Sequence, residues 1–154
     1  MTPEAKLKQL GITLPPCPRP LANYVPYRVA GDLVFISGQI PVVDGEVTCK
    51  GAVGGGVSVD DARAAARVCA TNLLAVAREA AGDLSHVEFL RVEGFVASAP
   101  GFTGQPAVVN GASDFLVEIL GDAGKHSRFA VGVAELPAGA SVEIGAVVRV
   151  TASA

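Results

Sequence analysis

The clearest pattern in the chain is an apolar stripe at helical spacing between residues 58 and 81. Ser58 and Asp61 form a capping box at its start, and Gly82 stands where a C-terminal glycine belongs. The stripe consists mainly of small residues: Ala62, Ala65, Ala66, Cys69, Leu73, Val76, Ala77 and Ala80. This pattern predicts a long helix that lies close on a sheet, with Cys69 packed in the core rather than reactive.

Two further helices are predicted. Thr2-Pro3-Glu4 combines a hydroxyl cap, a proline at the first helical position and an early acid, so a short helix should run from there to Gly11. A proline-rich stretch over residues 15–20 ends this element. The other helix follows a loop at residues 99–106 and ends before Gly121, with one apolar face made of Val109, Ala112, Leu116, Ile119 and Leu120.

Strands are predicted between these helices. Residues 27–29 and 33–37 read as two strands joined by a turn, and further strands are expected at residues 86–98, 127–135 and 142–150. The order of elements indicates an α+β fold, a two-layer sandwich with a mixed β-sheet and the two main helices packed on one face. The other face of the sheet then needs a different cover.

The whole-chain properties narrow the function classes. A length of 154 residues fits one domain, residues 1–154, in which residues 1–21 form an N-terminal helix and proline-rich extension. A formal charge of −3 gives no basic surplus for nucleic acid. The polar N-terminus and the short apolar runs predict a soluble, cytoplasmic protein with no membrane partner.

Two composition features invite a chemical interpretation that we do not favour. Three scattered cysteines and two distant histidines, His86 and His126, lack the spacing of metal ligands, so no metal site is expected. The glycine-rich segment 51–56 precedes a helix but lacks the Gly-Lys-Ser/Thr ending of a phosphate loop. A flexible linker is the better interpretation of that segment.

Alternation along the last two strands places an arginine on an unusual surface. Phe129, Val131 and Val133 should point toward the helices. The opposite face carries Arg128 among small residues, together with Glu143 from the final strand. If the two strands form a tight hairpin, Arg128 and Glu143 lie about 20 Å apart, so they could share a site only between subunits.

Two interpretations of Arg128 remain open from spacing alone. Its planar guanidinium, in a recess between small residues, is suited to bidentate recognition of a carboxylate. The alternative is a solvated strand arginine, or one that pairs internally with an acid such as Glu143.

Two motifs resemble the RidA/YjgF family. Residues 127–137 and 140–144, Ser-Arg-Phe-Ala-Val-Gly-Val-Ala-Glu-Leu-Pro and Ala-Ser-Val-Glu-Ile, are similar to its C-terminal signature. Residues 35–41, Phe-Ile-Ser-Gly-Gln-Ile-Pro, resemble its N-terminal motif. Val109-Asn110 and Tyr24 also fall at family positions, and the resemblance extends from about Ala22 to Val150.

This resemblance implies a chorismate-mutase-like fold in a homotrimer whose sheet faces pack inward, with ligand clefts between subunits. It implies hydrolysis of reactive enamines and imines, such as those derived from 2-aminoacrylate, to 2-oxo acids and ammonia without a cofactor. Arg128 would bind the substrate carboxylate and Glu143 would activate water. The cleft would be lined by Tyr24, Ser37, Gly38, Asn110 and Ala130.

The chain also departs from the family pattern. Ala130 stands where deaminases carry a cysteine, and the family's Glu-Ile-Glu is here Glu143-Ile144-Gly145, so one acid is missing. These changes keep open a non-catalytic protein that binds small 2-imino or 2-oxo acids and acts in regulation. An endoribonuclease is the weaker alternative, because the chain has no basic, aromatic strip.

Overall fold

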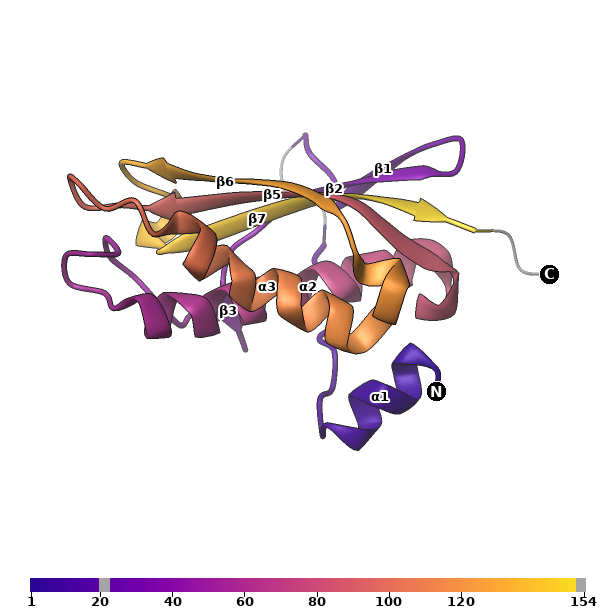
Figure 1. Ribbon diagram of the computed structural model, residues 1–154. Helices are drawn as coiled ribbons and strands as arrows, with labels where there is room; N and C mark the ends of the chain where they lie inside the picture. The colour runs from indigo at the N-terminus through magenta and orange to yellow at the C-terminus, as the bar shows by residue number, and fades with distance from the viewer. Residues whose placement is uncertain (20–22, 152–154) are drawn as a thin grey trace.

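The computed structural model describes residues 1–19 and 23–151, and it is built around a five-stranded sheet with helices on one face (Figure 1). The strand order is β1 (Tyr27–Ala30), β2 (Leu33–Gln39), β7 (Val142–Val150), β5 (Val87–Ala97) and β6 (Ser127–Val133). Helices α2 (Val59–Ala81) and α3 (Gln105–Leu120) form the second layer. The predicted α+β sandwich with a mixed sheet is confirmed.

Helix α2 begins and ends as the sequence predicts. The Ser58 hydroxyl accepts a hydrogen bond from the Asp61 amide at 3.1 Å, and Gly82 ends the helix with a φ of 80°. The predicted stripe is buried, apart from the half-buried Ala80, and Cys69 lies fully in the core. A second side of α2 is buried as well, because α3 packs along it.

Two glycines let α3 approach its neighbours closely. A β-carbon at Gly111 would overlap the carbonyl oxygen of Arg63 on α2. A β-carbon at Gly124, in the short helix η2 (Gly121–Gly124), would overlap the carbonyl oxygen of Leu116 on α3. Backbone therefore packs directly on backbone at both contacts, which fixes the position of α3 between α2 and η2.

The expected hairpin between the last two strands is wrong. Strand β5 lies between them: it pairs with β6 in parallel and with β7 antiparallel. The physical reason is the connection through α3, because a strand–helix–strand crossover makes β5 and β6 parallel neighbours. The residues after β6, including helix η3 (Pro137–Gly139), then carry the chain past β5 to β7.

The predicted facing of β6 is also wrong. Arg128, Ala130 and Gly132 point toward the helix layer, since Arg128 pairs with the fully buried Val92 and bonds to α3. Phe129 and Val131 point away and are 37% and 41% exposed. Space explains the reversal, because a β-carbon at Gly132 would already lie 2.8 Å from the Gln105 amide nitrogen.

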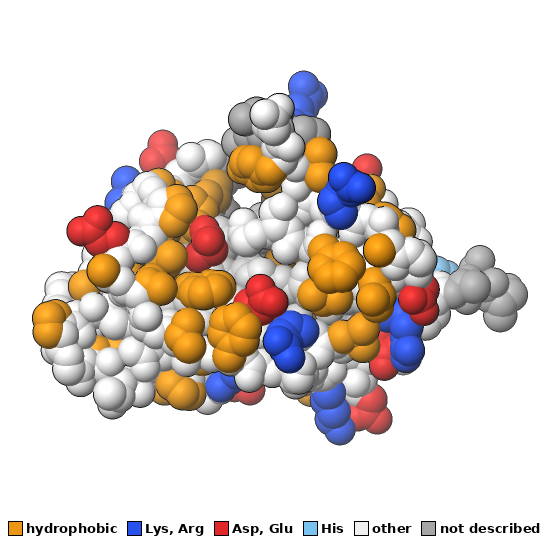
Figure 2. All heavy atoms as spheres, turned by 90° about the horizontal axis from the view of Figure 1, so that it is seen from above, with side chains coloured by type: hydrophobic (Ala, Val, Ile, Leu, Met, Phe, Trp, Pro, Cys, Tyr) orange, Lys and Arg blue, Asp and Glu red, His pale blue; other side chains and the backbone are white. Residues whose placement is uncertain are grey.

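The sheet face opposite the helices, which we call the open face, is uncovered in a single chain (Figure 2). Phe35 is 47% exposed there, and the rings of Phe95 and Phe129 meet edge to face with centroids 5.6 Å apart. Figure 2 shows hydrophobic side chains over this surface with acidic and basic ones between them. An apolar surface of this kind is typical of a contact with another chain.

The N-terminal helix α1 (Pro3–Gln9) lies beyond the helix layer, on the side away from the sheet (Figure 1). The Thr2 hydroxyl caps it as predicted, accepting from the Ala5 amide at 3.1 Å. Leu7 and Leu14 are buried in the core. The Glu4 carboxylate accepts a hydrogen bond from the Leu84 amide at 2.8 Å, at the start of η1 (Leu84–His86).

Two glycine-containing loops fold more tightly than a linker would. A turn at Asp44-Gly45 joins the short strands β3 (Val42–Val43) and β4 (Glu46–Val47). Segment 51–56 is not a flexible linker, because internal hydrogen bonds tie it together. Val53 within it is fully buried and its amide donates to the Ala97 carbonyl at 2.8 Å.

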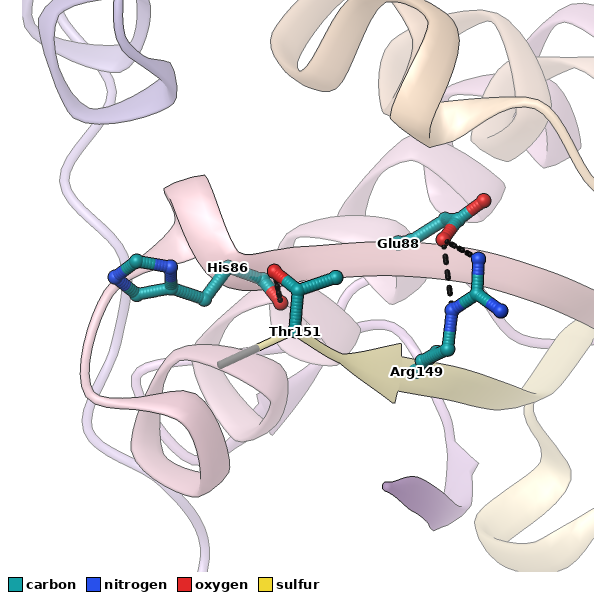
Figure 3. A network of polar contacts seen from close by, with 4 residues as sticks. All are labelled: His86, Glu88, Arg149 and Thr151. Carbon is teal, nitrogen blue, oxygen red and sulfur yellow. Dashed lines mark hydrogen bonds and ion pairs between the residues drawn. The ribbon is translucent and has the colours of Figure 1, made fainter. Parts of the chain in front are cut away.

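A polar network fastens the start of β5 to the end of β7 (Figure 3). The Arg149 guanidinium donates twice to the Glu88 carboxylate, at 3.0 and 2.5 Å. The Thr151 hydroxyl donates to the His86 carbonyl at 3.2 Å. The two bonds to Glu88 pair Arg149, which lies on the open face, with an acid of its own chain.

Candidate functional site

Arg128 is held against α3 by two hydrogen bonds. Its Nη1 donates to the side-chain oxygen of Asn110 at 2.8 Å and to the hydroxyl of Ser113 at 3.1 Å. Within residues 1–19 and 23–151, its Nε and Nη2 donate no hydrogen bond to another protein group. The guanidinium therefore has a fixed orientation, and two donor nitrogens, Nε and Nη2, are left for an anion.

Ser113 and His126 extend this arrangement, and neither was predicted to belong to the site. The Ser113 hydroxyl lies 2.9 Å from His126 Nε2, and His126 Nδ1 lies 2.6 Å from the Gly124 carbonyl oxygen. Burial, and to a smaller degree the charge of Arg128, lower the pKa of His126. Spacing places Ser113 three residues after Asn110, on the same face of α3, which is the signal that could have found it.

Glu143 lies on the open face, half-buried in β7. It pairs with Phe95 of β5, and its carboxyl group lies beside Gly38, where a β-carbon would be 3.1 Å from Glu143 Cδ and Oε1. Burial raises the pKa of this carboxyl above its usual range. A carboxylate with a raised pKa is a stronger base than an ordinary surface glutamate.

A β-bulge in β2 places Gly38 beside Glu143. Ile36 pairs with Ala146 and Gln39 with Ile144, so two residues of β2 oppose one of β7 between these pairs. Gly38 then lies against Glu143, as described above. The bulge thus provides the close approach that only a glycine permits.

Tyr24 lies on the segment that precedes β1. Ser37 anchors this segment, because its hydroxyl donates to the Val25 carbonyl at 2.6 Å and its amide donates to the Pro26 carbonyl at 2.9 Å. Tyr24 is 57% exposed. Its exposure leaves the ring available for contact outside its own chain.

Glu93 is a further acid of the open face that sequence reasoning missed. It pairs directly with Gly145, and a β-carbon on that glycine would lie 3.7 Å from Glu93 Oε2. The carboxylate that the Glu-Ile-Gly sequence lacks is therefore supplied to the same region by a neighbouring strand. Alternation within β5 indicates its face, but the register with β7 could not be predicted from sequence.

The structure separates the seven predicted site residues into two groups. Arg128, Asn110 and Ala130 belong to the helix side of β6; we call them the arginine group. Glu143, Ser37, Gly38 and the adjoining Tyr24 form the acid group at the open face. Two strand spacings and three residues separate Arg128 from Glu143, which puts their Cα atoms about 14 Å apart, on opposite faces of the sheet.

Two surface grooves of the single chain lie elsewhere. One, of about 630 Å³, is lined by residues of β1, β2 and the end of β7, among them Val29 and Val34. The other, of about 580 Å³, lies between α2 and residues 48–57. Arg128 and Glu143 line neither of these two grooves.

The candidate residues lie on a backbone that matches a known family. The family model described as YjgF/chorismate mutase-like, putative endoribonuclease matches residues 4–144. The chain belongs to the YjgF family. The family match spans β1, β2, β5, β6 and both main helices, and it ends at residue 144, near the start of β7.

Relatives of this YjgF protein match it over nearly its full length. Protein TCP17 of Trypanosoma cruzi is 42% identical over 147 residues, covering 94% of this chain and 92% of that protein. The crystal structure of Atu1372 from Agrobacterium tumefaciens, a protein of unknown function, is 46% identical with a TM-score of 0.90, covering 96% and 92%. E. coli TdcF with bound serine is 25% identical with a TM-score of 0.63, covering 88% and 94%.

No helix within the described residues is long and apolar enough to cross a membrane. Among the same residues, no three or more His, Cys, Asp or Glu side chains gather in an arrangement that could hold a metal ion.

Proposed function

We propose that this protein hydrolyses reactive enamines and imines derived from 2-amino acids, giving 2-oxo acids and ammonia. The observation that carries the proposal is the fixed guanidinium of Arg128, which keeps Nε and Nη2 for a ligand. A pair of donors on a planar group recognises a carboxylate in bidentate fashion. The relative TdcF was crystallised with serine, a small molecule that carries such a carboxylate.

The complete site forms between subunits of a homotrimer. The arginine group of one chain and the acid group of another meet when the open faces pack inward. Three observations support this arrangement: the two groups lie on opposite faces, Glu143 lies about 14 Å from Arg128 within one chain, and apolar side chains of the open face are exposed. Tyr24 and Ala130 would line the cleft from its two sides.

The chemistry requires little beyond positioning. The 2-aminoacrylate enamine tautomerises to 2-iminopropanoate, whose C2 is electrophilic. Glu143 accepts a proton from water as the water oxygen adds to C2, and the resulting carbinolamine expels ammonia after protonation of its nitrogen, leaving pyruvate. Holding the carboxylate and one water in place lowers the barrier without a cofactor.

A carboxylate-binding protein without catalysis is the second candidate. One observation favours it: the arginine group is assembled within a single chain. In the proposed deaminase, by contrast, the catalytic acid has to come from a neighbouring subunit. Endoribonuclease activity, which the family description includes, is opposed by the net charge of −3. The two leading candidates differ only in turnover, so one assay separates them.

The test generates 2-aminoacrylate enzymatically and follows pyruvate and ammonia release. Wild type should accelerate release, and Arg128→Ala should lose about 100-fold in affinity for 2-oxo acids, because hydrogen bonds to a charged group are removed. Arg128→Lys keeps the positive charge but lacks the planar pair of donors, so we expect its affinity for 2-oxo acids to lie between those of Arg128→Ala and wild type. Binding of pyruvate without any acceleration would leave the binding protein and exclude the deaminase.

The trimer has its own test. Light scattering on a size-exclusion column should give three times the mass of the 15.6 kDa chain. Phe129→Asp places a charge on the exposed apolar surface and should dissociate the assembly. A monomeric wild-type protein that retains full activity would exclude a site shared between subunits.

A further inference from the structure

A chain of polar side chains runs from Arg128 into the contact between α3 and η2. Arg128 Nη1 lies 3.1 Å from Ser113 Oγ, which lies 2.9 Å from His126 Nε2. His126 Nδ1 in turn lies 2.6 Å from the Gly124 carbonyl oxygen. The neighbouring surface of α3 is apolar and buried, with Val109, Ala112 and Leu116 on it.

The donors and acceptors in this series of hydrogen bonds have one consistent assignment. The Gly124 carbonyl can only accept, so His126 Nδ1 carries a proton. In the neutral ring Nε2 is then an acceptor, and the Ser113 hydroxyl donates to it. The lone pairs of the same hydroxyl accept the bond from Arg128. Burial lowers the pKa of His126 and favours this neutral form.

The backbone fixes both ends of this series of hydrogen-bonded side chains. Gly124 packs on the backbone of α3 so closely that a β-carbon would overlap the Leu116 carbonyl oxygen. Gly111, two residues before Ser113, packs as closely on the backbone of α2 at Arg63. The carbonyl that orients His126 and the helix that carries Ser113 therefore keep their relative position.

We propose that Ser113 and His126 are positioning residues that set the orientation of the Arg128 guanidinium for its carboxylate ligand. The inference rests on the proposed carboxylate site and adds two residues that touch neither ligand nor reacting atoms. Asn110 alone holds Nη1 at one point and leaves the guanidinium plane free to turn about that bond. The second bond, to Ser113, removes this freedom, and His126 keeps the Ser113 lone pair aimed at Arg128.

The experiment measures pyruvate affinity by calorimetry on the intact assembly. Ser113→Ala should weaken binding about tenfold, because one bond to a charged group is lost. Ser113→Thr keeps the hydroxyl and should stay within about twofold of wild type. His126→Phe keeps an aromatic ring but removes its nitrogens, and it should weaken pyruvate binding about threefold. His126→Gln retains an acceptor for the Ser113 hydroxyl and should keep most of the wild-type pyruvate affinity.

Thr71→Ala is the matched control, since it removes a helix hydroxyl that donates to the Arg67 carbonyl within α2, away from Arg128. It should leave pyruvate affinity unchanged. If Ser113→Ala binds as tightly as wild type while Arg128→Ala does not, the positioning role is excluded and the carboxylate site stands. The positioning role is also excluded if Ser113→Thr binds pyruvate as weakly as Ser113→Ala, and His126→Gln as weakly as His126→Phe. If Arg128→Ala binds as tightly as wild type, the proposed function itself fails.

Discussion

The arginine group and the acid group differ in how much of each is complete within one chain. Arg128 has two protein partners and a third residue behind them. Glu143 has a raised pKa from burial and a glycine against its carboxyl, but no hydrogen bond from another residue in the described part of the chain. In the proposed function, binding is thus prepared by the fold of a single chain, whereas chemistry depends on the assembly. The following predictions test this division.

Glu143→Gln should give the largest effect. Removing the base lowers kcat by about 100-fold, while pyruvate affinity should stay within about twofold because Arg128 is intact. In wild type, kcat should fall as pH decreases through the pKa of Glu143, and that fall should begin at a higher pH than for an ordinary glutamate, because burial raises this pKa. Steady-state kinetics with a pH series measure both. Loss of pyruvate affinity in Glu143→Gln would contradict the division.

The same variant is expected to fold normally. A carboxyl whose pKa is raised by folding stabilises the protein below its unfolded pKa, and this contribution is lost as pH rises through the folded pKa. The uncharged amide avoids that loss. Thermal unfolding at neutral pH should therefore show Glu143→Gln to be at least as stable as wild type.

Mixed assemblies test whether the two groups come from different chains. Arg128→Ala and Glu143→Gln are each inactive alone. When the two are unfolded together and refolded at equal concentrations, roughly a quarter of the sites join an intact Arg128 to an intact Glu143, so about a quarter of wild-type activity should return. Simple mixing without subunit exchange is the control. If no activity returns after exchange is shown by mass, one chain must supply both residues.

Two neighbouring glycines of the open face form a matched pair. Gly38→Ala places a β-carbon 3.1 Å from Glu143 Cδ, whereas Gly145→Ala places one no closer than 3.7 Å to any atom outside its neighbours. The first should displace the carboxyl and lower kcat about tenfold, and the second should change it less than twofold. Kinetics of the purified variants decide this. Equal losses of kcat in the two variants would mean that the position of the Glu143 carboxyl does not limit catalysis.

His126→Gln gives the smallest expected effect, seen in stability rather than activity. Burial lowers the pKa of His126 in the folded protein, so the stability it contributes is present above the unfolded pKa and is lost as pH falls through the folded pKa. Between pH about 7 and about 5, Tm should fall in the variant by roughly 2 °C less than in wild type. An identical fall in both proteins would argue against a buried neutral histidine.

The sequence was sufficient for the elements but not for their pairing. The caps at Thr2 and Ser58 and the apolar stripe of α2 are local signals, and the structure confirms them. The position of β5 between β6 and β7 depends on a crossover through α3, for which no local pattern exists.

The facing of β6 shows why hydrophobicity alone misled. Its larger residues, Phe129 and Val131, were expected to meet the helices, but the space beside α3 accepts only small ones such as Gly132. The sequence could not predict that Ser113 and His126 interact, because their interaction depends on the packing of η2 against α3. Arg128 and Glu143 were singled out by strand alternation and by a family pattern, and their role in a site stays a prediction.

Strand β6 also bears on solubility, because it is an edge strand of the sheet. Its seven residues, Ser127–Val133, combine aromatic and β-branched residues with alanine and glycine, and Arg128 is the only charge among them. Unpaired, largely apolar edge strands recruit further strands and aggregate, and a charge within them opposes this. Replacing Arg128 is therefore expected to make this edge of the sheet more prone to aggregation, apart from any loss of ligand affinity.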